Sequence, residues 1–102
     1  MDMIKQVFLG FIKIHILYHS SKEPIYGAEI ARELARHGYH ISFGTLYPTL
    51  HSLEEDSLLT SYQKIVNGKK RKYYKITKEG KKTLKEIRGK IRELVDEVIY
   101  EK

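Results

Sequence analysis

The residues of this sequence that could do chemistry are basic side chains gathered in one stretch. Nine lysines and arginines stand between residues 64 and 82 against one acid, Glu79, which makes a local charge of +8. A field of that sign attracts polyanions, although a single lysine-rich helix is more often a solvated face. The chemistry to expect is therefore capture of phosphates or of an acidic partner, provided that the fold gives this cluster a shape.

Sets of residues that support catalysis are not discernible. The chain has no cysteine, which excludes thiol nucleophiles, disulfides and thiolate zinc sites. There is no glycine-rich phosphate loop, Ser/His/Asp set or pair of carboxylates. His15 and His19 are four residues apart and could share a metal ion, but no carboxylate at matching spacing accompanies them. We therefore expect no enzyme, no cofactor and no metal site, with His15 buried beside an apolar stripe and His19 at a helix end.

Length and charge place the chain in a broad class. Its 102 residues fit one domain, and its net charge of +6 corresponds to an isoelectric point near 9.5. The longest apolar run, residues 7–12, contains Gly10 and is far shorter than the roughly 20 residues that span a bilayer. These features predict a soluble cytoplasmic protein with no membrane partner.

Hydrophobic periodicity predicts three helices in the first half of the chain. Apolar side chains recur at three- and four-residue steps over residues 2–18. A second periodic stretch contains Ile30 and Leu34 and stops at Gly38. A third helix is expected over residues 44–56, where three leucines point one way: Leu46, Leu50 and Leu53.

Pro48 leaves two possible starts for the third helix. Ser42 could cap it, in which case Pro48 strains the second turn, because proline lacks the backbone N–H that the helix needs there. Alternatively, Thr45 caps it and Pro48 occupies the third helical position, where no donor is required. The second start is the preferred prediction.

Alternation of side chains replaces helical periodicity after residue 58. Two strands are expected, over residues 59–66 and 70–76, around the dipeptide Asn67-Gly68. That dipeptide suits a tight hairpin because both of its residues adopt positive φ. The two-residue turn predicts a register that pairs Val66 with Lys69, Lys64 with Arg71 and Tyr62 with Tyr73. The tip of the hairpin is therefore cationic.

The last segment is typical of an amphipathic helix that packs against a second copy of the chain. Thr77 is a suitable cap, with Glu79 in the first turn. At 1.5 Å per residue the helix approaches about 40 Å, more than the rest of the domain can cover. Its apolar seam has too few heptads for an independent coiled coil, so the first helix should contribute to the dimer. The predicted interface consists of Phe8, Phe11, Leu84, Ile87, Ile91, Leu94, Val95 and Val98.

Together these elements indicate an α+β, mostly α, fold. Residues 1–76 are interpreted as a winged helix-turn-helix domain and residues 77–102 as a dimerisation helix. In such a domain the third helix enters the major groove of DNA, and the hairpin, or wing, lies along the backbone or minor groove. The predicted DNA-binding residues are Thr45, Tyr47, Pro48, Thr49, His51 and Ser52 on the helix and Lys64, Lys69, Lys70, Arg71 and Lys72 on the wing.

Two motifs carry a family resemblance. Gly-Thr-Leu-Tyr-Pro at residues 44–48 and Arg-Lys-Tyr-Tyr at residues 71–74, followed by Thr77 and Gly80, resemble the PadR family of transcriptional regulators. The resemblance spans residues 26–84. It implies a homodimeric winged-helix repressor that binds a partly palindromic operator in double-stranded DNA and is released by a small ligand or a stress signal. It also implies that Thr45, Tyr47 and Pro48 read DNA and that Lys69–Lys72 form the wing.

The chain departs from the family pattern at three positions. Phe43, Ser52 and Ser57 stand where the family often has proline, arginine and glycine. Without an arginine at Ser52, binding is expected to shift toward the wing. Ser57 must end its helix without the conformational freedom of glycine.

The length and aromatic content bear on the effector that the resemblance implies. The chain resembles the short branch of the family, in which some members sandwich flat aromatic ligands between tryptophans. It has no tryptophan, so that pocket cannot be carried over intact. A small apolar or aromatic effector at the dimer interface remains the expectation.

A second class of function stays open on the residues alone. The wing could serve an interaction module that binds RNA or an acidic protein and has no specific operator. Replacing Thr45 and Tyr47 by alanine separates the two hypotheses. The change should abolish operator preference in a repressor and hardly affect a protein that binds through the wing alone.

Overall fold

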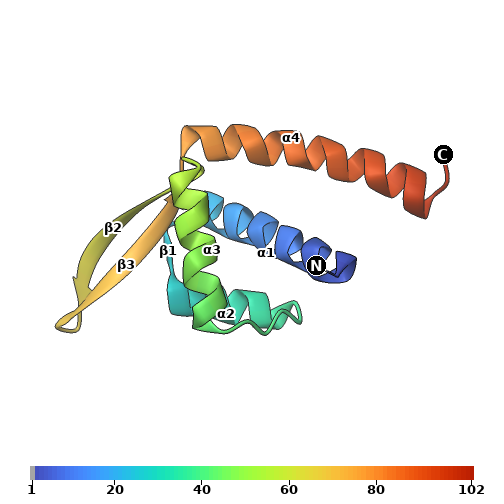
Figure 1. The fold of residues 1–102 in the computed structure, drawn as a ribbon. Coiled ribbons are helices and arrows are strands. Elements are labelled where there is room, and N and C mark those ends of the chain that lie inside the picture. Colours follow the sequence, from blue (N-terminus) through green and yellow to red (C-terminus); the bar gives the residue numbers. More distant parts are fainter. Residues whose placement is uncertain (1) are drawn as a thin grey trace.

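The computed structural model describes residues 2–102 and shows helices around a small antiparallel sheet, the winged-helix class that the sequence predicts (Figure 1). In chain order the elements are α1 (Met3–Lys22), β1 (Ile25–Tyr26), α2 (Gly27–Arg36), α3 (Phe43–Glu55), β2 (Leu59–Val66), β3 (Lys69–Ile76), α4 (Lys78–Leu94) and a π-helical turn, η1 (Val95–Ile99). The β2–β3 hairpin projects away from the helices, and α4 packs along α1.

Helix α1 is longer than predicted at its C-terminal end. The carboxylate of Asp2 accepts a hydrogen bond from the Ile4 N–H (3.1 Å), and the helix runs to Lys22 instead of residue 18. The buried hydroxyl of Ser20 donates to the carbonyl of Leu17 (3.1 Å), so this serine is satisfied inside the helix instead of ending it. Within residues 2–102, no helix has the length and apolar character needed to cross a bilayer.

The start of α3 corrects the preferred prediction. Ser42 is the cap: its hydroxyl accepts a hydrogen bond from the Thr45 N–H (3.2 Å), and the helix begins at Phe43. Such a cap stabilises a helix by about 1 kcal/mol. Pro48 therefore lies in the second turn and removes the donor that would bond the Gly44 carbonyl. Gly44 is exposed, so water can hydrate that carbonyl, which makes the arrangement tolerable.

The sheet confirms the predicted hairpin and adds one strand. All three predicted cross-strand pairs are present, and Asn67 and Gly68 have φ of 51° and 78°, as the tight turn requires. Strand β1, which the sequence analysis did not foresee, pairs Ile25 with Tyr74 and Tyr26 with Tyr73. Two residues are too few to show alternation, so only pairing with β3 identifies them as a strand.

The core lies where the first three helices and the start of α4 meet the sheet. Leu46, Leu50 and Leu53 are buried, as predicted, so the opposite face of α3 is turned to solvent. Full burial of one such side chain stabilises the fold by about 1.5–3 kcal/mol. The remaining core residues are Ile12, Ile16, Leu17, Ile25, Ile30, Leu34, Leu59, Tyr74, Ile76 and Leu84.

Helix α4 begins at the predicted cap and is anchored to the end of α3. The Thr77 hydroxyl accepts a hydrogen bond from the Gly80 N–H (2.9 Å) and donates one to the carbonyl of Ser57 (2.5 Å). A Cβ atom at Gly80 would clash with the carbonyl oxygen of Leu58, so the glycine permits this close approach. The contact fixes where α4 leaves the wing.

The far end of α4 differs from the predicted continuous helix over residues 77–102. The α-helix ends at Leu94, and Val95–Ile99 form the π turn, in which the Tyr100 N–H donates to the Val95 carbonyl (3.2 Å). A π turn holds more residues than an α turn, so the three- and four-residue spacing of the predicted seam does not continue unchanged through Val98. Val98 is 63% exposed and Val95 is half-buried, so residues 2–102 cover little of this segment.

Candidate nucleic-acid interface

The predicted DNA-reading residues of α3 lie on its solvent face. Thr45, Tyr47, Pro48 and His51 are exposed, whereas Thr49 and Ser52 are half-buried at its edges. The Thr49 hydroxyl donates to the carbonyl of Thr45 (2.8 Å), which leaves it less free to bind a ligand. The first turns of the helix therefore offer the most accessible polar side chains.

Two packing contacts fix the position of the Tyr47 side chain on that face. Its ring stacks on the ring of Phe43, with centroids 5.5 Å apart and planes at 23°. It also packs over Gly27 at the start of α2, where a Cβ atom would lie 2.9 Å from the Tyr47 hydroxyl oxygen. Tyr47 is nevertheless 49% exposed. Its hydroxyl is thus held at a defined place at the surface between α2 and α3.

The structure brings Tyr47 and the wing together around one hollow. The hollow has a volume of about 270 Å³ and is lined by Tyr26, Gly27, Ala28, Tyr47, Lys70, Arg71 and Lys72. Residues of α3 and of the cationic hairpin, predicted separately, therefore border the same surface depression. A polyanion that lies in it can touch both elements at once.

The five predicted basic residues of the wing fall on its two faces. The register places Lys64 opposite Arg71, with Lys69 two residues along on the same face, while Lys70 and Lys72 alternate to the other. Like charges directly opposite one another are unfavourable in a sheet, so the pair of Lys64 and Arg71 gains from a bound anion. The charge on this hairpin is therefore poorly neutralised by the protein itself.

Arg71 is held by two tyrosines. Its guanidinium lies 4.0 Å from the centroid of the Tyr26 ring, and Nη1 donates a hydrogen bond to the Tyr73 hydroxyl (3.4 Å). That hydrogen bond raises the pKa of Arg71 and favours its charged form. The Tyr26 ring is in edge contact with the Tyr73 ring, and the Tyr73 ring stacks on that of Tyr62. This aromatic row orients Arg71 on the outer face of the sheet.

Lys72 differs from its neighbours because α3 supplies it with a counter-ion. Its Nζ lies 3.9 Å from the Glu54 carboxylate, which also accepts a hydrogen bond from the Ser61 hydroxyl (2.6 Å). The pair joins the wing to the C-terminal end of α3. Lys72 is therefore less available to an external phosphate than Lys69 or Lys70.

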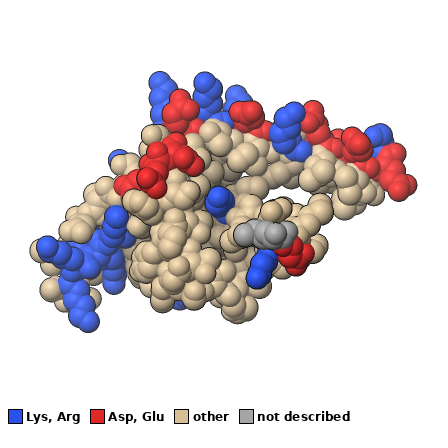
Figure 2. All heavy atoms as spheres, viewed as in Figure 1, with Lys and Arg blue, Asp and Glu red and all other residues tan. Residues whose placement is uncertain are grey.

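The surface charge is distributed less uniformly than the sequence cluster suggests. Figure 2 shows Lys and Arg gathered at the hairpin tip without acids beside them, whereas along α4 blue and red side chains alternate. The acids on α4 include Glu79, Glu86 and Glu93. The wing, not the start of α4, is therefore the strong part of the positive field.

Two residues that the sequence analysis did not assign also belong to this surface. Arg32 of α2 donates a hydrogen bond from Nη2 to the Tyr26 hydroxyl (3.1 Å), and its guanidinium carbon lies 5.9 Å from the centroid of the same ring. Tyr26 is thus placed between two arginines. Only the pairing of β1 with β3 brings these groups together, and no periodicity in the sequence signals it.

The predicted dimer residues divide into a buried and an exposed group. Leu84 is only 3% exposed and belongs to the core, which leaves little of it for a partner, and Ile87 and Val95 are half-buried. The exposed members share one property, an apolar side chain that the described residues leave 38–63% exposed: Phe8, Phe11, Ile91, Leu94 and Val98. They lie on α1 and on the outer half of α4 and η1, two neighbouring helices that run in opposite directions in Figure 1.

The comparisons with known proteins agree on one family. The profile of the transcriptional regulator PadR-like family matches residues 16–86. A transcriptional regulator of Mycobacterium tuberculosis is 47% identical over 88 residues, which are 86% of this chain and 82% of that protein.

Solved structures with this fold include two regulators of the same family. A PadR-like transcription factor of Bacteroides fragilis is 33% identical, with a TM-score of 0.83 over 99% of this chain and 100% of that one. A PadR family regulator of Eggerthella lenta is 35% identical, with a TM-score of 0.82 over 94% of this chain and 85% of that one.

Proposed function

Because the chain belongs to the PadR-like family of transcriptional regulators, we propose that it is a homodimeric repressor that binds a partly palindromic operator. In this proposal α3 enters the major groove and the wing follows the phosphate backbone. The observation that carries it is the hollow in which Tyr47 of α3 meets Lys70, Arg71 and Lys72 of the wing. A wing that acted alone would not need a shared surface with the reading helix.

Specific reading is assigned to the exposed side chains of α3. Thr45 and Tyr47 have hydroxyl groups that can donate to or accept from base edges, and His51 offers a ring nitrogen. His51 Nε2 lies 3.3 Å from the Glu55 carboxylate, so a base contact by His51 competes with this exposed ion pair. Thr45 and Tyr47 therefore contribute most of the sequence preference.

Affinity independent of sequence is assigned to the wing. Lys64, Lys69, Lys70 and Arg71 have no carboxylate partner among residues 2–102. If each neutralises one phosphate, the dimer neutralises about eight, and log K falls with log salt with a slope of about −7.

Dimerisation is assigned to α1 and α4. Leu94 is 58% exposed and Phe8 is 50% exposed, and apolar side chains of this size in a row are costly to leave in water. A two-fold axis beside them places two α3 helices at half-sites about one helical turn apart. In this scheme residues 1–76 bind DNA and residues 77–102 hold the copies together.

Release is assigned to a small apolar or aromatic ligand beside this interface. A hollow of about 470 Å³ is lined by Phe8 and Ile12 of α1 and by Tyr39 and Ile41 of the loop before α3. The Phe8 and Tyr39 rings meet edge to face, with centroids 5.9 Å apart. A ligand in the hollow would press on that loop and so change the position of α3.

Binding to the region upstream of the gene that encodes the protein tests the proposal. Fluorescence anisotropy should show two protomers per operator, preference over random duplex and the steep salt dependence given above. The double variant Thr45→Ala/Tyr47→Ala should lose the preference and keep the weak affinity for random duplex. Equal affinity of the wild type for both duplexes at physiological salt would contradict sequence-specific repression and would favour an interaction module with a basic wing.

A further inference from the structure

Three histidines from two separate helices meet beside the hollow between α1 and α4. His15 and His19 lie one turn apart on α1, and His37 caps the C-terminal end of α2. One ring nitrogen of each lies within 4.8 Å of the others. The rings are close to parallel, with centroids of His15 and His37 4.5 Å apart and those of His15 and His19 6.1 Å apart. None of the three histidines is among the predicted DNA-binding residues.

His15 and His19 are half-buried, and one of their ring nitrogens lacks a hydrogen-bond partner in the described part of the chain. His19 Nε2 is buried and has no hydrogen-bond partner in the described part of the chain, which is unusual for a buried polar atom. Burial lowers the pKa of His15, and the neighbouring His37 and His19 lower it further. Neutral imidazole is the form that binds metal ions.

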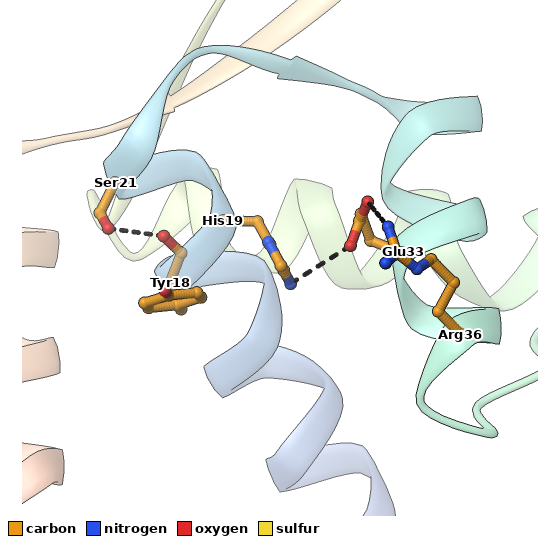
Figure 3. A network of polar contacts seen from close by, with 5 residues as sticks. All are labelled: Tyr18, His19, Ser21, Glu33 and Arg36. Atoms are coloured by element: carbon orange, nitrogen blue, oxygen red, sulfur yellow. Dashed lines mark hydrogen bonds and ion pairs between the residues drawn. The ribbon is translucent and has the colours of Figure 1, made fainter.

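One carboxylate lies beside His19. Glu33 of α2 lies with one oxygen 4.0 Å from His19 Nε2, too far for a hydrogen bond, while its other oxygen accepts one from Arg36 Nη1 (3.2 Å) (Figure 3). Figure 3 shows the His19 ring directed from α1 toward Glu33 on α2. Arg88 of α4 lines the neighbouring hollow, and its positive charge disfavours a bound cation, whereas the negative charge of Glu33 favours one.

From these contacts we propose that His15, His19 and His37 form a site for one divalent first-row transition-metal ion such as Zn²⁺, and that Glu33, which lies beside His19, approaches as the fourth ligand when the ion binds. Three imidazoles and a carboxylate without thiolate suit borderline ions. Bonds of 2.0–2.1 Å in a tetrahedron place ligand nitrogens about 3.3 Å apart, so the nitrogens must close by at most about 1.5 Å. His37 is exposed at a helix end, where rotation of its side chain can supply most of this movement.

The position of the site suggests what the ion would do to the protein. The loop between α2 and α3 starts at His37 and leads to Ser42, the cap of α3. An ion bound to His37 and to α1 would tie the start of this loop to the first helix. The ion therefore pins the segment that precedes the reading helix.

Metal titration of tag-free protein, first stripped with a chelator, tests the site without any DNA, so the result is independent of the proposed function. Co²⁺ is the probe, because a four-coordinate site gives intense visible absorption bands, whereas the octahedral hydrated ion absorbs only weakly. We expect one Co²⁺ per chain, displaced by Zn²⁺. His37→Ala should weaken Co²⁺ binding at least tenfold, and His40→Ala, three residues away, should leave it unchanged.

The exposed position of His37 makes its variant decisive, because a change there should not unfold the chain. A circular dichroism melt of each variant verifies the fold. The site is refuted if Co²⁺ added to stripped wild-type protein keeps the weak absorption spectrum of the hydrated ion. It is equally refuted if folded His37→Ala binds Co²⁺ as tightly as His40→Ala does.

Discussion

Adding one methyl group at Gly27 should weaken operator binding through Tyr47. A Cβ atom there would lie 2.9 Å from the Tyr47 hydroxyl oxygen, 3.0 Å from Cε1 and 3.2 Å from Cζ. Carbon contacts are favourable only from about 3.5 Å, so the ring of Tyr47 must retreat by about 0.5 Å. The ring is the end of a flexible side chain at a surface hollow, so it can move without unfolding the protein.

The expected size follows from what Tyr47 does in the proposed complex. A base contact is worth about 1–3 kcal/mol, and a shift of this size should cost about the lower value, or roughly a tenfold loss of operator affinity. Helix propensity favours alanine over glycine by up to about 1 kcal/mol and opposes the steric cost. The free energy of unfolding of Gly27→Ala should therefore stay within about 1 kcal/mol of the wild type.

Fluorescence anisotropy with operator DNA and urea denaturation measure the two effects separately. Gly89→Ala on α4 is the matched control, because a Cβ atom at Gly89 meets nothing within 4 Å. It should bind operator as the wild type does. In a double-mutant cycle, Gly27→Ala should add no further loss to Tyr47→Ala. Equal operator affinity of Gly27→Ala and Gly89→Ala would show that the position of Tyr47 does not matter for DNA binding.

Three further changes test other parts of the structure. Leu94 is 58% exposed, so Leu94→Glu should leave the fold intact. The added charge should prevent dimerisation, so the variant should sediment as a monomer and lose operator affinity. An unchanged dimer would show that α4 is not part of the interface. Ser57→Gly should raise the free energy of unfolding in urea by about 1 kcal/mol, because Ser57 has φ of 62°, and no gain would contradict strain there. Lys69→Ala should make the slope of log K against log salt less steep by about 2, because a dimer loses two phosphate contacts. Lys72→Ala should change that slope by less, because Lys72 is already paired with Glu54. Identical slopes for the two variants would exclude a difference between these lysines in phosphate binding.

Local signals allowed the sequence to predict much of the fold. The positive φ of Asn67 and Gly68 establishes the turn, and a two-residue turn leaves one register for the strands. The Thr77 cap and the leucine face of α3 depend on residues within one or two turns of each other. The DNA-facing side of α3 followed from the same leucines, because the side opposite a buried stripe is exposed.

Predictions failed where the sequence allowed two helix starts or carried no periodic pattern. Both Ser42 and Thr45 can cap a helix. The start at Ser42 is possible because solvent can hydrate the Gly44 carbonyl, which Pro48 leaves without a hydrogen-bond donor. Strand β1 is too short to have a pattern. The π turn after Leu94 lies in a segment that is mostly exposed, and no pattern in the sequence signals it.

The sequence by itself determined the four helices to within a few residues of their ends, the hairpin register and the location of the positive charge, since each depends on neighbours along the chain. Only the tertiary structure decided which of these side chains meet. It placed Tyr47 over Gly27, paired Lys72 with Glu54 and brought His37 to within 4.8 Å of His15. Such contacts join residues 18 to 22 positions apart, and they arise from the packing of whole helices and strands, which no spacing in the sequence encodes.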